Sequence, residues 1–75
     1  MRCIIVSSEN KQEFEKVQSI TLPAFLGELQ ILPDHAESFI ALHQGKIILE
    51  SEKVSNIPIE NGICHIKDNI ATIIL

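Results

Sequence analysis

Short apolar segments alternate with short polar stretches along the whole of this chain. The apolar segments are rich in isoleucine and valine, and residues such as Gly, Asn, Asp and Ser separate them. β-Branched segments bounded by such turn residues are typical of strands. We therefore predict an all-β fold with strands at Cys3–Val6, Phe14–Leu22, Leu29–Leu32, Gly45–Glu50, Val54–Ile59, Ile63–Ile66 and Ile70–Leu75.

Turn signals separate these predicted strands. They lie at Ser7–Asn10, Phe25–Gly27, Pro33–Asp34, Gln44–Gly45, Asn61–Gly62 and Asp68–Asn69. The Asp68-Asn69 pair suits a two-residue hairpin turn, although Asn-Gly or Asp-Gly would be a stronger signal. Many short strands at this spacing indicate a β-sandwich or a barrel.

The segment Asp34–Gln44 also carries helix signals. Asp34 followed by Glu37 has the form of a capping box, and Gly45 fits the residue after a helix end. We nevertheless predict a strand here, because tertiary context routinely overrides local propensity. A short helical turn near Asp34–Glu37 is compatible with this prediction.

Three predicted strands contain apolar triplets, at Ile4–Val6, Ile47–Leu49 and Ile73–Leu75. Successive side chains of a strand point to opposite faces of the sheet, so a triplet places apolar groups on both faces. Either the outer side chains are tolerated on edge strands, or a partner protein covers them.

The 75 residues allow one domain with one core, and the apolar fraction of 45% offsets the small size. The net charge is −4, with no Lys/Arg run and neither Tyr nor Trp, which argues against nucleic-acid binding. The longest apolar run falls far short of the roughly 20 residues of a membrane-spanning helix. The N-terminus also lacks the apolar core of a signal peptide. We expect a protein of the cytosol or a cytosol-like compartment.

The two cysteines, Cys3 and Cys64, lie far apart and lack Cys-x-x-Cys spacing. Two buried thiols are the simpler interpretation in a reducing compartment. A disulfide is possible only if the first strand and a late strand are neighbours.

Catalytic motifs are missing from the chain. There is no phosphate-binding loop, no dinucleotide-binding fingerprint and no nucleophile elbow. Glu13 and Glu15 share a strand face while Phe14 between them points to the core, which is ordinary strand alternation. We expect no catalytic residue and no cofactor.

The three histidines, His35, His43 and His65, do not form a metal-ligand set. His65 follows Cys64 directly, and adjacent strand residues point to opposite faces. A metal site needs three or four convergent ligands. We expect no metal site.

The most specific pattern lies between Leu22 and Ala36. It reads L-P-x-x-x-G-E-x-x-I-L-P-x-H-A, with Leu22-Pro23, Gly27-Glu28, Ile31-Leu32-Pro33 and His35-Ala36 in register. This spacing resembles the epsilon subunit of the F-type ATP synthase, which is called delta in mitochondria. The likeness extends over almost the whole chain, from Ile5-Val6-Ser7 to the closing Asn69–Leu75.

The resemblance implies a two-sheet β-sandwich of short, mainly antiparallel strands that occupies residues 1–75 as a single domain. Ala24, Gln30 and Asp34 stand where the family has glycine, so Ala24 and Asp34 must lie in turns that tolerate a Cβ. The family's C-terminal helical hairpin is expected to be absent from this chain, which ends at Leu75.

The resemblance also implies a function. The family's sandwich is a non-catalytic part of the rotor at the foot of the central stalk, where it couples the gamma subunit to the c-ring during ATP synthesis. Gly27, Glu28 and Leu29 match the turn that faces the polar loops of the c-ring. The positions that match the gamma-facing side are Ser7, His35 and Ile40. The implied location is peripheral, at the cytoplasmic face of the inner (plasma) membrane, without direct insertion.

Two other classes of function stay open. One is a free-standing, diverged β-sandwich that binds proteins without a rotary role. The other is a small enzyme or ligand-binding sandwich, which predicts a pocket with converging polar groups. Replacing Glu28 with Lys is expected to weaken assembly under the rotor hypothesis alone.

Overall fold

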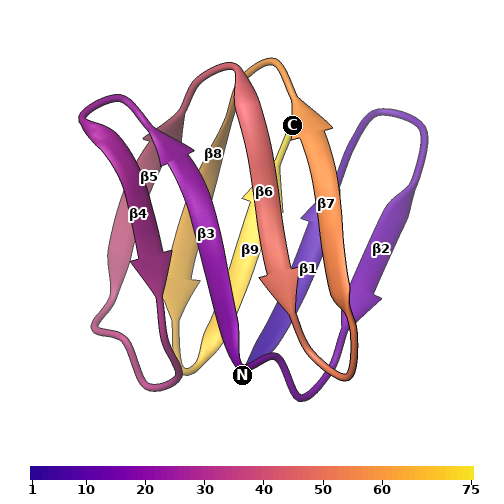
Figure 1. Ribbon diagram of the computed structural model, residues 1–75, viewed down its shortest axis with the longest axis vertical. Helices are drawn as coiled ribbons and strands as arrows, with labels where there is room; N and C mark the ends of the chain where they lie inside the picture. The colour runs from indigo at the N-terminus through magenta and orange to yellow at the C-terminus, as the bar shows by residue number, and fades with distance from the viewer.

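Every regular element of the protein is a β-strand (Figure 1). The computed structural model describes residues 1–75. The strands are β1 (Arg2–Val6), β2 (Lys11–Phe14), β3 (Ser19–Ala24), β4 (Gly27–Ile31), β5 (Ser38–Leu42), β6 (Gly45–Glu50), β7 (Val54–Ile59), β8 (Gly62–Lys67) and β9 (Ile70–Ile74). Since the chain forms no helix, it contains no membrane-spanning helix.

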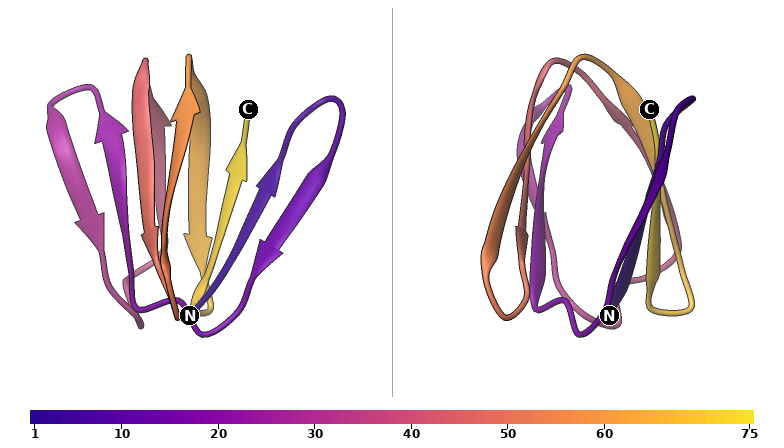
Figure 2. Two further views of the ribbon diagram at one scale, coloured as in Figure 1. Left: turned by 45° about the vertical axis from the view of Figure 1, so that its right-hand side comes forward. Right: turned by 90° about the vertical axis from the view of Figure 1, so that its right-hand side faces the viewer.

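The nine strands form one curled sheet whose two halves face each other as the layers of a sandwich (Figure 2). The first layer has the order β2-β1-β9-β8-β5, and the second has the order β4-β3-β6-β7. All neighbouring strands are antiparallel except β1 and β9, which are parallel. The layers join where Leu42 at the end of β5 pairs with Ala24 of β3. The predicted all-β sandwich of mainly antiparallel strands is confirmed.

The core lies between the two layers. Strand alternation turns every second side chain inward, as with Cys3 and Ile5 of β1 and with Ile47 and Leu49 of β6. The core contains fourteen buried residues: Cys3, Ile5, Val17, Ile20, Leu22, Ile31, Leu42, Ile47, Leu49, Ile59, Cys64, Ile66, Ala71 and Ile73. The high content of isoleucine thus supplies both strand propensity and core volume.

One predicted strand, Phe14–Leu22, is wrong, because its residues belong to β2 in the first layer and β3 in the second. The chain crosses between the layers at Glu15–Gln18, where Lys16 adopts a left-handed φ of 53°. This crossing is anchored by three main-chain hydrogen bonds, one of which runs from the N-terminal amine of Met1 to the carbonyl of Val17 (3.0 Å). The N–H of Val17 donates to the carbonyl of Met1 (2.7 Å), and that of Gln18 donates to the carbonyl of Glu50 (2.7 Å).

Within the segment Asp34–Gln44, the strand prediction is confirmed for Ser38–Leu42, which is β5, and no helical turn forms at the start of the segment. Asp34 has φ 66°, whereas a residue that caps a helix N-terminus needs an extended backbone. Its N–H donates instead to Oδ1 of Asn69 (2.8 Å). β5 then pairs with β8 along its whole length, so alternate residues of β5 find main-chain partners in a neighbouring strand instead of within a helix.

The predicted hairpin turn at Asp68-Asn69 is confirmed. Both residues have positive φ, 53° and 62°, as the central residues of a type I′ turn require. Two further strands, β6 and β7, have the predicted bounds of Gly45–Glu50 and Val54–Ile59.

The two cysteines are both free and buried. β9 lies between the strands that carry them, β1 and β8. Their Cα atoms are therefore at least two strand spacings apart, about 9–10 Å, whereas a disulfide needs less than about 7 Å. The interpretation as two buried thiols is confirmed.

Candidate protein-docking surface

The outer side of the first layer is largely apolar, and we call it the outer face. At its centre, strand pairing arranges the side chains in two rows that cross the layer from β1 to β5, and a third row of Arg2, Ile70 and Lys67 lies beside them. One row consists of Val6, Ile74, Ile63 and Ala41, and the other of Ile4, Thr72, His65 and Phe39. These residues define the outer face.

Large apolar side chains of the outer face are open to solvent. Phe39 is 69% exposed, Ile74 is 51% exposed and Ile63 is 42% exposed. Contiguous apolar patches of this kind usually mark protein-binding sites, whereas single exposed residues do not.

The outer side of the second layer has a different character. The corresponding cross-strand row there consists of Gln30, Thr21, Ile48 and Asn56, in which only Ile48 is apolar. Because the two outer sides differ, the molecule has a polar side and an apolar side. The outer face of the first layer is therefore the stronger candidate for a docking surface.

One aromatic residue of the outer face is held in place by its neighbours. Phe39 stacks on His65, its direct cross-strand partner, with ring centroids 4.2 Å apart and planes 9° apart. Nε2 of His65 lies 3.2 Å from Oε2 of Glu37. Contacts on two sides of the imidazole thus orient the ring on which Phe39 rests.

Charged residues lie at the β2 edge of the outer face. Arg2 forms ion pairs with Glu13 and with Glu15, the latter at 2.9 Å. The hydrogen bond and charge of Arg2 hold the pKa of Glu13 below its usual value. Phe14 packs against the core, as predicted for the residue between the two carboxylates. The carboxylates therefore belong to a solvated ion-pair cluster at the rim of the apolar surface.

The residues predicted to face a c-ring, Gly27, Glu28 and Leu29, form the start of β4 at one end of the sandwich (Figure 1). Gly27 has φ +122°, a conformation that L-residues rarely adopt. The two turn residues before it are large and apolar, and both are exposed, Phe25 by 68% and Leu26 completely. These two residues directly precede the three predicted residues, and no motif in the sequence had marked them as binding residues.

The residues predicted for a gamma-facing side, Ser7, His35 and Ile40, do not form one cluster. Ser7 closes the β1–β2 turn, where its Oγ accepts a hydrogen bond from the N–H of Asn10 at 3.3 Å. His35 lies in the β4–β5 loop at the opposite end of the sandwich (Figure 1). Ile40 packs against the core, so it points the opposite way from its neighbours Phe39 and Ala41.

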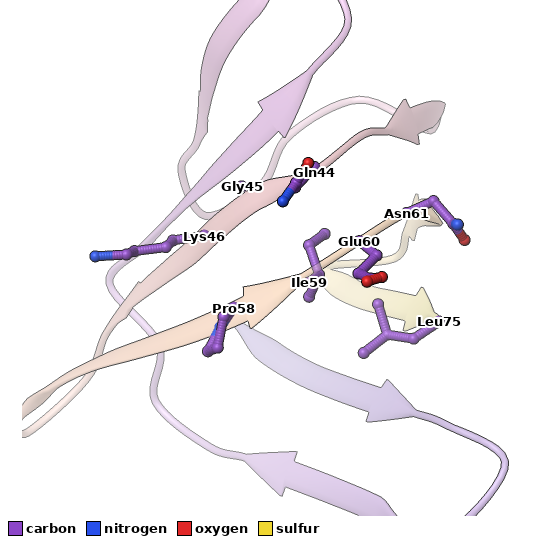
Figure 3. Close-up of a pocket in the computed structure, with 8 residues that line it drawn as sticks. All are labelled: Gln44, Gly45, Lys46, Pro58, Ile59, Glu60, Asn61 and Leu75. Carbon is purple, nitrogen blue, oxygen red and sulfur yellow. The ribbon is translucent and has the colours of Figure 1, made fainter.

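A hollow of about 610 Å³ lies near the C-terminal residue. Its lining consists of Gln44, Gly45, Lys46, Pro58, Ile59, Glu60, Asn61 and Leu75. The polar ends of Lys46 and Asn61 point away from each other in Figure 3. Ligand sites instead gather a few polar groups that converge on one point.

The structure does not bring together three or more His, Cys, Asp or Glu side chains that could hold a metal ion.

Three comparisons with known proteins agree with this architecture. Residues 1–75 match the family described as "ATP synthase, Delta/Epsilon chain, beta-sandwich domain". The chain is 34% identical over 71 residues to the ATP synthase epsilon chain of Leptospira borgpetersenii serovar Hardjo-bovis (strain JB197), an alignment that covers 93% of this chain and 56% of the relative. The chain therefore spans about half the length of that relative.

The fold is also similar to a chain in the cryo-EM structure of the Tetrahymena thermophila mitochondrial ATP synthase, central stalk and c-ring. The TM-score is 0.84 at 20% sequence identity, and the match covers 99% of this chain and 61% of that one. This likeness supports the fold, and the match over residues 1–75 supports the family. The chain therefore belongs to the ATP synthase delta/epsilon chain family, as its β-sandwich domain.

Proposed function

We propose that this chain is the sandwich part of a non-catalytic rotor subunit in the central stalk of an F-type ATP synthase. In this role it fastens the gamma subunit to the c-ring, so that rotation of the ring turns the shaft while ATP is made. The observation that carries the proposal is an exposed apolar outer face on a chain of this family. The subunit acts by binding proteins and needs no catalytic residue of its own.

The outer face is the surface that we assign to the gamma subunit. Burial of apolar area drives association, and a rigid sheet presents that area without a large ordering cost. Ser7 and His35 lie at opposite ends of this contact in our proposal. Ile40 supports it from within the core, beneath Phe39 and Ala41.

The end of the sandwich that carries Gly27, Glu28 and Leu29 is the surface that we assign to the polar loops of the c-ring. In this arrangement Glu28 pairs with a basic residue of a ring loop. The subunit lies at the cytoplasmic face of the inner (plasma) membrane and is held there through its protein partners. No observation favours a free-standing sandwich or a ligand-binding sandwich over this role.

A substitution on the outer face tests the gamma assignment. Ile63→Asp places a charge at a site that is 42% exposed, so the fold should survive. We expect this variant to bind the gamma subunit from the same source at least about tenfold more weakly, because an unpaired charge would be buried in the interface. The measurement is calorimetric titration, and Val54→Asp on the distant strand β7 is the matched control. Equal affinities of Ile63→Asp and the unchanged protein would remove the outer face from the gamma contact.

A second substitution tests the assignment of the c-ring end. Glu28→Lys reverses the charge that is proposed to pair with a ring loop. We expect it to weaken co-elution with a gamma–c-ring assembly and to leave binding to gamma alone unchanged. Intact assembly of the Lys variant would remove Glu28 from the ring contact.

A further inference from the structure

A groove of about 450 Å³ lies between β5 and the β3–β4 turn. Residues 24–29 and 39–41 line it, and Glu28 is the one charged residue among them. Four of the lining side chains are large, apolar and open to solvent, namely Phe25, Leu26, Leu29 and Phe39. Two-residue turns favour Gly, Asn and Asp, so turn formation does not explain Phe25 and Leu26.

Both aromatic walls of the groove are held by histidines. Phe25 lies against His43, with ring centroids 5.2 Å apart and planes tilted by 37°. Phe39 stacks on His65, and His65 is held in turn by Glu37. A groove whose walls are already ordered loses less conformational freedom when it is filled, which favours binding.

The groove also borders an unpaired strand edge. The N–H of His43 donates to the carbonyl of Pro23 (3.0 Å), which shows that this residue directs its main-chain groups toward β3. Alternate residues of a strand direct their main-chain groups to the same side. Phe39 therefore directs its N–H and C=O away from β8, on the side of the groove. The pairing of β5 with β3 is confined to Leu42, so Phe39 has no strand partner on that side.

We propose that this groove binds an extended segment of the gamma subunit. The segment pairs its main chain with Phe39, in the manner of a strand added to an exposed sheet edge. One of its apolar side chains enters the groove between Phe25 and Phe39.

The inference rests on the proposed function, because the occupant is assigned through continuity with the proposed gamma contact. Phe39 belongs both to the outer face and to the groove. The outer face and the groove are therefore continuous, and a partner that covers the outer face also lies next to the groove.

A matched pair of variants at Phe39 isolates the main-chain contact. Phe39→Ala and Phe39→Pro both remove the ring, and only Phe39→Pro also removes the N–H that faces the groove. We expect Phe39→Pro to bind the gamma subunit about fivefold to tenfold more weakly than Phe39→Ala in calorimetric titrations, as loss of one hydrogen bond implies. Equal affinities of the two folded variants would overturn the proposal.

Amide hydrogen exchange tests the same contact in the unchanged protein, so the proposal stays testable even if Phe39→Pro does not fold. We expect the amide of Phe39 to exchange at least about tenfold more slowly in the gamma complex than in the free chain. Binding of gamma without protection at Phe39 would overturn this inference and leave the proposed function standing. Failure of the unchanged chain to bind gamma at all would overturn both.

Substitutions in the groove wall test the apolar contact. Phe25→Ser removes an exposed side chain, and Val54→Ser removes one of similar exposure on β7, at 68% and 59%. We expect Phe25→Ser to weaken binding of gamma by about tenfold and Val54→Ser to leave it unchanged. An effect of Phe25→Ser that appears only when the c-ring is present would identify the ring as the occupant and overturn the assignment to gamma.

Discussion

The thiol groups of Cys3 and Cys64 lie inside the core, on β1 and β8. Burial raises the pKa of each thiol to about 12. In the unfolded chain a thiol ionises near pH 8.5. The folded state therefore holds protons that the unfolded state releases, and stability falls as pH rises from about 8.5 toward 12.

The reactivity of these thiols should reflect their burial, because the thiolate is the reactive form. We expect iodoacetamide to leave Cys3 and Cys64 unmodified in the folded protein at neutral pH and to modify both in denaturant. Mass spectrometry measures the extent of labelling. Rapid modification of either thiol in the folded protein would contradict their placement in the core.

Gly27 shows how one residue sets the geometry of the proposed ring-facing end. A Cβ at this position would meet no atom within 4 Å, so the effect of a side chain is one of backbone conformation alone. With φ at +122°, Gly27→Ala should lower the free energy of unfolding by about 1–2 kcal/mol. Urea denaturation measures the difference. A variant as stable as the unchanged protein would contradict the turn geometry.

At the residue scale, the sequence indicated that some strands carry apolar side chains on both faces, but it did not identify the residues that form the candidate docking surface. The apolar triplets correctly indicated side chains on both faces of β1 and β9, such as Ile4 and Ile74. Phe39 and Phe25 were not predicted as binding residues, because their exposure depends on which strands lie beside them. The direction of Ile40 depends on the register of β5 against β8, and the neighbouring sequence does not set that register.

At the element scale, the β8–β9 turn connects distant parts of the chain. Asn69 adopts φ 62°, and its Oδ1 accepts the hydrogen bond from the N–H of Asp34. Asn69→Gly keeps the permitted backbone conformation and removes the acceptor, whereas Asn69→Ala loses both. We expect losses in unfolding free energy of about 1 kcal/mol for Asn69→Gly and about 2–3 kcal/mol for Asn69→Ala.

Thermal and denaturant unfolding of the two variants measure these losses. If Asn69→Ala is as stable as Asn69→Gly, the positive φ contributes nothing and the type I′ assignment fails. If Asn69→Gly matches the unchanged protein, the hydrogen bond between the two loops carries no stability.

Strand positions with local turn signals were predictable, and the crossing between layers was not. Polar turn residues flank β6 and β7, so the first and last residues of these two strands can be predicted from the sequence. The crossing at Glu15–Gln18 has no Gly or Pro, and it is held by main-chain hydrogen bonds to Met1 and Glu50, which are distant from it in the sequence or lie in another strand. Hydrogen bonds between residues that are distant in the sequence cannot be predicted from a local sequence pattern.

At the scale of the whole molecule, the sandwich has one apolar outer side and one polar outer side. A solitary domain of this size would gain by solvating both sides. The apolar outer side is instead suited to cover by a partner, as the proposed rotor role requires. The family match over residues 1–75 agrees with this interpretation.

The most direct test of this account is a calorimetric titration of the 75-residue chain with the gamma subunit from the same source. We predict a one-to-one complex with a negative heat-capacity change, because the outer face would be buried on binding. Absence of binding by the folded chain at concentrations on the order of tens of micromolar would contradict the rotor role.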